Sequence, residues 1–80
     1  MTLTELFDII RPQCEMAFWN AWAELGYTAA DHKRKPSEVT TQQWEEDKAK
    51  AWAKTEAKQA ALYAEHGVWD HPEMAGAQRP

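Results

Sequence analysis

Histidine and cysteine side chains are the groups in this chain that could bind a metal ion or attack a substrate. The chain holds one cysteine and three histidines, which are Cys14, His32, His66 and His71. Zinc sites typically place their cysteines and histidines in closely spaced pairs, and these four residues follow no such spacing. Cys14 falls on an apolar helical stripe, where a buried thiol behaves as a small hydrophobic group. We therefore predict that the protein binds no metal or cofactor and is not an enzyme.

A short basic run offers a second kind of chemistry, electrostatic contact. It comprises His32, Lys33, Arg34 and Lys35. Such runs can touch phosphate groups or speed docking on an acidic protein surface. The whole chain, however, has a formal net charge of −4, whereas nucleic-acid-binding domains are usually basic. We interpret the run as a solvated turn that can make electrostatic contacts with a partner, and keep a small nucleic-acid-binding protein as an alternative.

Tryptophan is the residue type that the chain uses most unusually, with five in 80 residues. The stretch MAFWNAWAEL, residues 16–25, carries two of them three positions apart. Indole rings fill protein cores, and they are also enriched among the residues that dominate binding energy at protein interfaces. Which of these roles applies depends on the helices that carry the rings.

The first predicted helix spans residues 3–25. Thr2 and Glu5 have the spacing of a capping box, and Gly26 stands where a helix commonly ends. Pro12 interrupts the backbone hydrogen bonds, but the apolar stripe keeps its phase across it. We predict one helix kinked at Pro12, and a second helix that starts at Pro12 is the alternative. The stripe follows helical spacing and consists of Leu3, Leu6, Phe7, Ile10, Cys14, Ala17, Phe18, Ala21 and Leu25.

The second predicted helix spans residues 41–66. Thr40 and Gln43 form another candidate capping box. Nothing interrupts the helix from there until Gly67, which provides a stop signal. The chain is rich in alanine, glutamate, lysine and glutamine, which favour helices.

Two further segments join and follow these helices. The connector, residues 26–40, is long for a compact domain and has room for a short turn of helix near residues 28–32. After the second helix, residues 67–73 are expected to fold back as a short capping tail. Val68 would then lie on the last turn, and Trp69 would cover the end of the bundle.

These elements predict an all-α fold. A kinked N-terminal helix and a long C-terminal helix form an antiparallel helical hairpin, and a dimer of such hairpins would complete a four-helix bundle. Residues 1–73 are expected to make a single domain. Residues 74–80 are expected to be a disordered tail with nothing to pack against.

The first helix has apolar residues on two sides. One side holds the stripe, and the residues roughly opposite to it are Ile9, Pro12, Met16, Trp19 and Ala23. A hairpin can cover only one of these sides, so the second side is expected to meet another protein. The predicted protein-binding residues are Ile9, Met16, Trp19, Trp22 and, from the second helix, Trp52.

The alternative is a closed monomer, in which the chain covers its own second apolar side. Tyr27 and Val39 of the connector, or Trp69 of the tail, are the residues that could do so. Tryptophan and methionine at helical spacing commonly belong to a core, so both interpretations stay open.

The expected location is the cytoplasm. A single cysteine cannot form a disulfide within the chain and suits a reducing compartment. The first ten residues lack a basic leader, which argues against a signal peptide. No apolar run approaches the roughly 20 residues that are needed to span a bilayer.

In general character the chain resembles the small accessory proteins that bacteriophages encode. The features that carry this resemblance are a short chain, an acidic balance, one cysteine and tryptophan-rich helices. Many such proteins inhibit a host protein, for example a CRISPR complex, a regulator or a pilus motor. The resemblance therefore implies a non-enzymatic inhibitor that occupies a surface of a larger protein. A self-associating structural module is the alternative.

Overall fold

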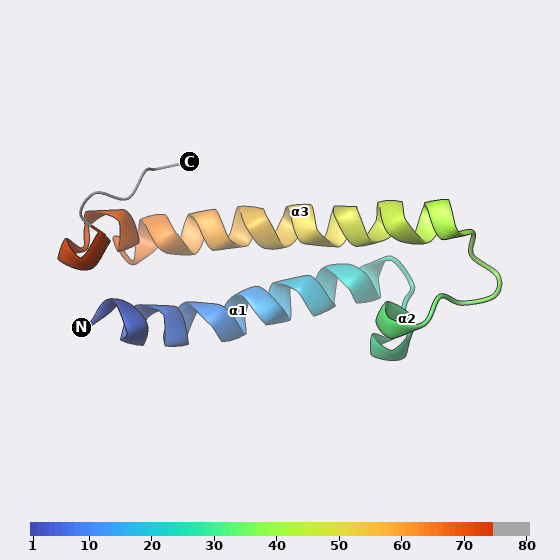
Figure 1. The fold of residues 1–80 in the computed structure, drawn as a ribbon, viewed down its shortest axis with the longest axis horizontal. Coiled ribbons are helices and arrows are strands. Elements are labelled where there is room, and N and C mark those ends of the chain that lie inside the picture. Colours follow the sequence, from blue (N-terminus) through green and yellow to red (C-terminus); the bar gives the residue numbers. More distant parts are fainter. Residues whose placement is uncertain (75–80) are drawn as a thin grey trace.

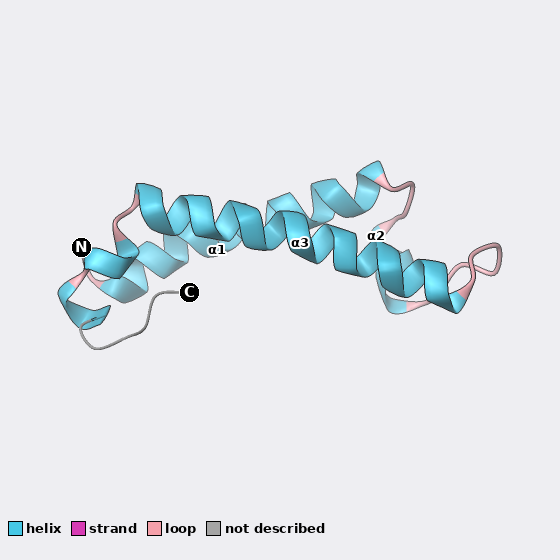
Figure 2. Ribbon diagram, turned by 90° about the horizontal axis from the view of Figure 1, so that it is seen from above, coloured by secondary structure: helices cyan, strands magenta, loops and turns pink. Residues whose placement is uncertain are grey.

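The chain folds into two long antiparallel helices that lie side by side (Figure 1). The computed structural model describes residues 1–74. Helix α1 spans Leu3–Glu24, the short helix α2 spans Ala29–Lys33 within the connector, and helix α3 spans Thr41–Glu65. Seen from above, α1 and α3 cross at a shallow angle (Figure 2). The predicted helical hairpin is confirmed, and both long helices end one residue earlier than expected.

A threonine side chain caps the N-terminus of each long helix, although the predicted capping boxes form only in part. Thr2 Oγ1 accepts a hydrogen bond from the N–H of Glu5 (3.2 Å) and donates to the Glu5 carboxylate (3.1 Å). Thr40 Oγ1 likewise accepts from the N–H of Gln43 (3.1 Å). The side-chain amide of Gln43 does not reach back to Thr40, because it donates to the buried Asp47 carboxylate instead (2.9 Å).

The connector is held against the helices through its backbone carbonyls. Thr28 and Asp31 form a complete capping box at the start of α2. The indole N–H of Trp22 donates to the Thr28 carbonyl (2.8 Å), and that of Trp44 donates to the Asp31 carbonyl (2.9 Å). Two of the five tryptophans thus fasten the connector. The short helix expected near residues 28–32 is confirmed as α2.

Pro12 lies inside α1, which is a single helix throughout its length. The prediction of one helix across Pro12 is confirmed, and the alternative of two helices is not. Pro12 lacks the N–H that would bond to the carbonyl of Asp8. One residue further on, the side-chain amide of Gln13 donates to the Ile9 carbonyl (3.2 Å).

Replacing Pro12 with alanine is expected to stabilise the protein by about 1–3 kcal/mol, because it restores a backbone hydrogen bond and removes the clash of the ring with a carbonyl. The Pro12 side chain is exposed, so the change removes no core contact. Thermal unfolding followed by circular dichroism should show a higher melting temperature. A melting temperature equal to that of the unmodified chain, or below it, would contradict this account.

The core consists of two apolar clusters, one toward each end of the hairpin. The buried residues of the cluster near the connector are Phe18, Ala21, Trp22, Tyr27 and Ala51. The buried residues of the cluster near the termini are Leu6, Ile10, Leu62 and Val68. Because there are only two long helices, each buries only the side that faces the other, so large parts of both stay exposed.

The segment after α3 folds back on the end of the hairpin. The 3-10 turn η1 spans Val68–Asp70 and follows Gly67, whose backbone is left-handed with a φ of 65°. Val68 is fully buried. Trp69 packs edge-on against Tyr63 of α3, with ring centroids 6.0 Å apart. These contacts confirm that the tail folds back as expected.

A second 3-10 turn, η2, spans Pro72–Met74 and ties the tail to the N-terminus. The carboxylate of Glu73 accepts a hydrogen bond from the N–H of Leu3 (3.0 Å). Met74 packs against the core cluster near the termini. Met74 therefore does not belong to the predicted disordered tail, whose other residues, 75–80, lie outside the described part of the chain.

Candidate protein-binding surface

One broad side of the hairpin is hollowed between α1 and α3. One hollow, of about 370 Å³, lies nearer the termini, and the residues that line it alone are Phe7, Ile10, Gln59 and Tyr63. The other hollow, of about 420 Å³, lies nearer the connector, and the residues that line it alone are Glu15, Phe18, Trp19 and His32. The residues that line both hollows are Arg11, Cys14, Trp52 and Thr55. Because they share these residues, the two hollows adjoin, and we call them together the aromatic groove.

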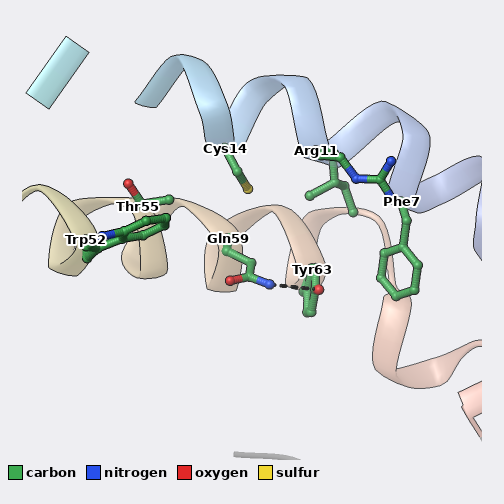
Figure 3. Close-up of a pocket in the computed structure, with 8 residues that line it drawn as sticks. Phe7, Arg11, Cys14, Trp52, Thr55, Gln59 and Tyr63 are labelled. Carbon is green, nitrogen blue, oxygen red and sulfur yellow. Dashed lines mark hydrogen bonds between the residues drawn. The ribbon is translucent and has the colours of Figure 1, made fainter. Parts of the chain in front are cut away.

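The two long helices form the walls of the aromatic groove (Figure 3). Trp52, Gln59 and Tyr63 follow one another along α3, and Cys14 points from α1 toward them. The side-chain amide of Gln59 donates to the Tyr63 hydroxyl (2.8 Å), and the Thr55 hydroxyl donates to a backbone carbonyl one turn earlier (2.9 Å). The α3 wall therefore presents aromatic surface whose neighbouring polar groups are already paired.

Phe18 is the centre of the ring contacts in the aromatic groove. Its buried ring packs against Trp52 of α3, with centroids 4.6 Å apart, and against Trp19, with centroids 5.1 Å apart. Trp19 is nevertheless 42% exposed, and Trp52 is 51% exposed. Trp19 and Trp52, two predicted binding residues from different helices, therefore flank Phe18 and belong to the same exposed surface.

Trp22 is a core residue, which corrects its predicted place on the binding surface. Its side chain is only 1% exposed. The ring stacks on Tyr27 with centroids 4.1 Å apart, and its N–H is bonded to the Thr28 carbonyl. The connector folds back over Trp22 and covers it, so this ring cannot meet a partner while the fold is intact.

Ile9 and Met16 are exposed, but they do not line the aromatic groove. At about 100° per residue, Met16 lies next to Trp19 on the outer edge of α1, and Ile9 lies two turns nearer the N-terminus on the same edge. The predicted surface thus divides into two parts. Trp19 and Trp52 lie in the groove, whereas Ile9 and Met16 lie on the outer edge of α1.

The described residues do not form the closed monomer that was the alternative. Tyr27 belongs to the core cluster near the connector, and Val39 packs against that cluster. Trp69 lies against Tyr63 at the other end of the hairpin. The side chain of Trp19, which these residues were expected to cover in a closed monomer, remains exposed.

Only half of the basic run is available for electrostatic contact. His32 packs its ring edge-on against Phe18, Trp19 and Trp22, with centroids 5.2, 5.4 and 5.7 Å apart. Lys35 Nζ donates to the carbonyls of Pro36 (3.2 Å) and Val39 (2.7 Å), so it closes a turn of the connector. The predicted electrostatic contact is therefore reduced to the other two members of the run, the exposed Lys33 and Arg34.

The aromatic groove carries balanced charge. Of the Lys, Arg, Asp and Glu residues described, Arg11 and Glu15 are those that line it. Arg11 Nη1 lies 3.9 Å from an Asp8 carboxylate oxygen, and both side chains are exposed, so this ion pair contributes little. On the other side of the two-helix contact, a separate hollow is lined by Lys50 and Lys54, whose Nζ atoms lie 3.7 Å from Asp47 and 3.0 Å from Glu24. The two sides of the hairpin therefore differ in aromatic content.

Within residues 1–74, no three His, Cys, Asp or Glu side chains come together in a way that could hold a metal ion. None of the described helices combines the length and apolar character that a membrane span requires. Comparisons with protein-family models, with curated proteins and with solved structures found no match.

Proposed function

We propose that this chain is a non-enzymatic helical protein-binding module, and that its aromatic groove covers an apolar surface of a protein partner. The observation that carries this proposal is the exposure of Trp19 and Trp52 on either side of the buried Phe18 ring. A fully buried tryptophan hides up to about 250 Å², so burying the exposed half of each indole would contribute roughly 2–3 kcal/mol. Two such rings on one surface are a strong anchor for an interface.

The finer form of the proposal is that the partner is a larger host protein, that binding inhibits it, and that the two meet in the cytoplasm. The resemblance to small bacteriophage accessory proteins motivates this form. A protein of this size can act by occupying a surface that another molecule needs, and it requires no catalytic group to do so. Met16 lies beside Trp19 and extends the apolar surface to the outer edge of α1, where a flexible thioether suits adaptable contacts.

Photo-crosslinking in the cells that naturally produce the protein tests the proposed function. Trp52 is replaced by the photoreactive residue p-benzoylphenylalanine, and cross-linked products are identified by mass spectrometry. The matched control carries the same residue in place of Ala53, which is exposed on the same helix and does not line the groove. Protein adducts are expected from position 52 and not from position 53. An absence of adducts at position 52, or equal adducts at both positions, would overturn the proposed function.

A further inference from the structure

We infer that the aromatic groove pairs with the same groove of a second copy of this chain, in an antiparallel arrangement with two-fold symmetry. Trp19 of each copy then lies against the partner's Phe7, and Arg11 lies against the partner's Glu15. The inference rests on the proposed function, because it names a second copy of this chain as the protein that occupies the groove. A larger host protein would then bind outside the groove, at the exposed Met16 and Ile9 on the outer edge of α1. Three features of the groove support a second copy: the order of its residues along α1, their order along α3, and its charge.

Along the α1 wall of the aromatic groove, the order of residue types is almost the same from either end. Its residues at four-residue spacing are Phe7, Arg11, Glu15 and Trp19, and all four line the groove. Side chains four residues apart form a ridge along a helix. This ridge runs aromatic, cation, anion, aromatic. When a second copy is turned end for end, aromatic ring meets aromatic ring and cation meets anion.

The α3 wall has the same kind of order. Its lining residues are Trp52, Thr55, Gln59 and Tyr63, which run aromatic, polar, polar, aromatic. The middle of this wall lies near residue 57, and the middle of the α1 ridge lies at residue 13. The two midpoints face each other because the ends of the walls are paired. Phe7 packs against Tyr63 with centroids 5.8 Å apart, and Phe18 packs against Trp52. A single two-fold axis that passes through both midpoints therefore relates each wall to the same wall of the second copy.

The charges of the groove favour this arrangement over a parallel one. Antiparallel pairing brings Arg11 to the partner's Glu15 twice, whereas parallel pairing in register would oppose like charges. Both side chains are exposed and available, because Arg11 has only its weak contact with Asp8 and no ion pair or hydrogen bond holds Glu15 within the described residues.

The dimensions of the hairpin also suit a dimer. The molecule measures 49 × 21 × 17 Å, so its broad side is large enough for the about 800 Å² per partner that a stable interface buries. Two hairpins that face each other form a four-helix bundle, and the hollow near Phe7 and Tyr63 provides the space that the partner's Trp19 enters. Met16 and Ile9 stay outside this interface, so the dimer still presents them to a larger partner.

Charge reversal at Arg11 and Glu15 tests the two-fold pairing. In sedimentation equilibrium the unmodified chain is expected to have twice its 9.2 kDa mass. Arg11→Glu alone and Glu15→Arg alone should each weaken self-association by roughly tenfold to a hundredfold, because each opposes like charges across the interface. A one-to-one mixture of the two variants should restore the dimer, since each then meets an opposite charge. Lys58→Glu, at an exposed position on α3 that lines neither hollow of the groove, is the control and should stay dimeric.

Several outcomes overturn the inference. The unmodified chain could sediment as a monomer, the two reversed variants could associate as tightly as the unmodified chain, or their mixture could stay monomeric. Circular dichroism of each variant shows whether its helices are intact, and both substitutions are at exposed positions that do not contribute to the core. A monomeric chain whose position 52 still cross-links to other proteins would overturn the dimer alone and leave the proposed function in place.

Discussion

Replacing Trp22 with alanine is expected to unfold a large part of the protein at 37 °C. The ring is 1% exposed, stacks on Tyr27 and bonds to the Thr28 carbonyl, so its removal leaves a cavity in the core and frees the connector. Such a truncation costs about 3–5 kcal/mol, against a total stability of about 4–12 kcal/mol for a chain of this length. The melting temperature measured by circular dichroism should fall by roughly 12–40 °C.

Trp52 is the matched control for this experiment, since it is the same residue type on the surface. Trp52→Ala removes a half-exposed ring that packs against Phe18. Because only about half of its surface is buried, the loss of stability is expected to be smaller, roughly 2–3 kcal/mol. Both tryptophan variants, and the chain they are compared with, also carry Arg11→Glu, which is expected to keep them monomeric. The measured loss of stability then does not include a loss of self-association caused by Trp52→Ala. Equal losses of stability from the two tryptophan variants would contradict the assignment of Trp22 to the core and Trp52 to the surface.

Asp47 is expected to give the second large effect, because it is a buried carboxylate that fastens the connector to α3. It accepts hydrogen bonds from the Tyr27 hydroxyl (2.6 Å) and the Gln43 amide (2.9 Å), and Lys50 Nζ lies 3.7 Å away. Asp47→Ala leaves the Tyr27 hydroxyl without an acceptor and is expected to cost about 1.5–3 kcal/mol. Urea unfolding at pH 7 should show a lower midpoint with an unchanged slope. An unchanged midpoint would show that this hydrogen bond contributes nothing to stability.

The same hydrogen bond predicts how stability depends on pH. Donation from Tyr27 holds the pKa of the Asp47 carboxyl below its ordinary value of 3.8, and the bond to Asp47 raises the pKa of Tyr27 from 10.0 to about 12. The unfolded chain therefore takes up the Asp47 proton first as the pH falls below about 4, so stability decreases there. The unfolded chain also loses the Tyr27 proton first as the pH rises, so stability decreases between pH 10 and about 12.

Tyr27→Phe separates this effect from other groups that titrate in alkali. The variant should lose the decrease in stability that Tyr27 causes between pH 10 and about 12, when urea unfolding is measured across that range. Tyr63→Phe is the control, because the Tyr63 hydroxyl accepts from Gln59 and makes no bond to a carboxylate. If both variants have the same alkaline profile, the bond between Tyr27 and Asp47 is not its cause.

The helices and most of their boundaries can be predicted from the sequence alone. Thr2, Thr40, Gly26 and Gly67 mark helix ends through contacts with residues only a few positions away. The apolar stripe of the first helix continues across Pro12 and correctly predicted one helix there. These features are readable because helix formation depends on hydrogen bonds and caps between near neighbours in the chain.

Which tryptophans are buried and which are exposed depends on how the helices and the connector pack. Trp19 and Trp22 are three residues apart on one helix, yet only Trp22 is covered, because the connector folds over it and supplies the Thr28 carbonyl. Trp19 and Trp52 are far apart in the sequence, and they flank one Phe18 ring only because of how α1 packs against α3. Such long-range contacts depend on the register of two packed helices, which no local spacing along the chain specifies.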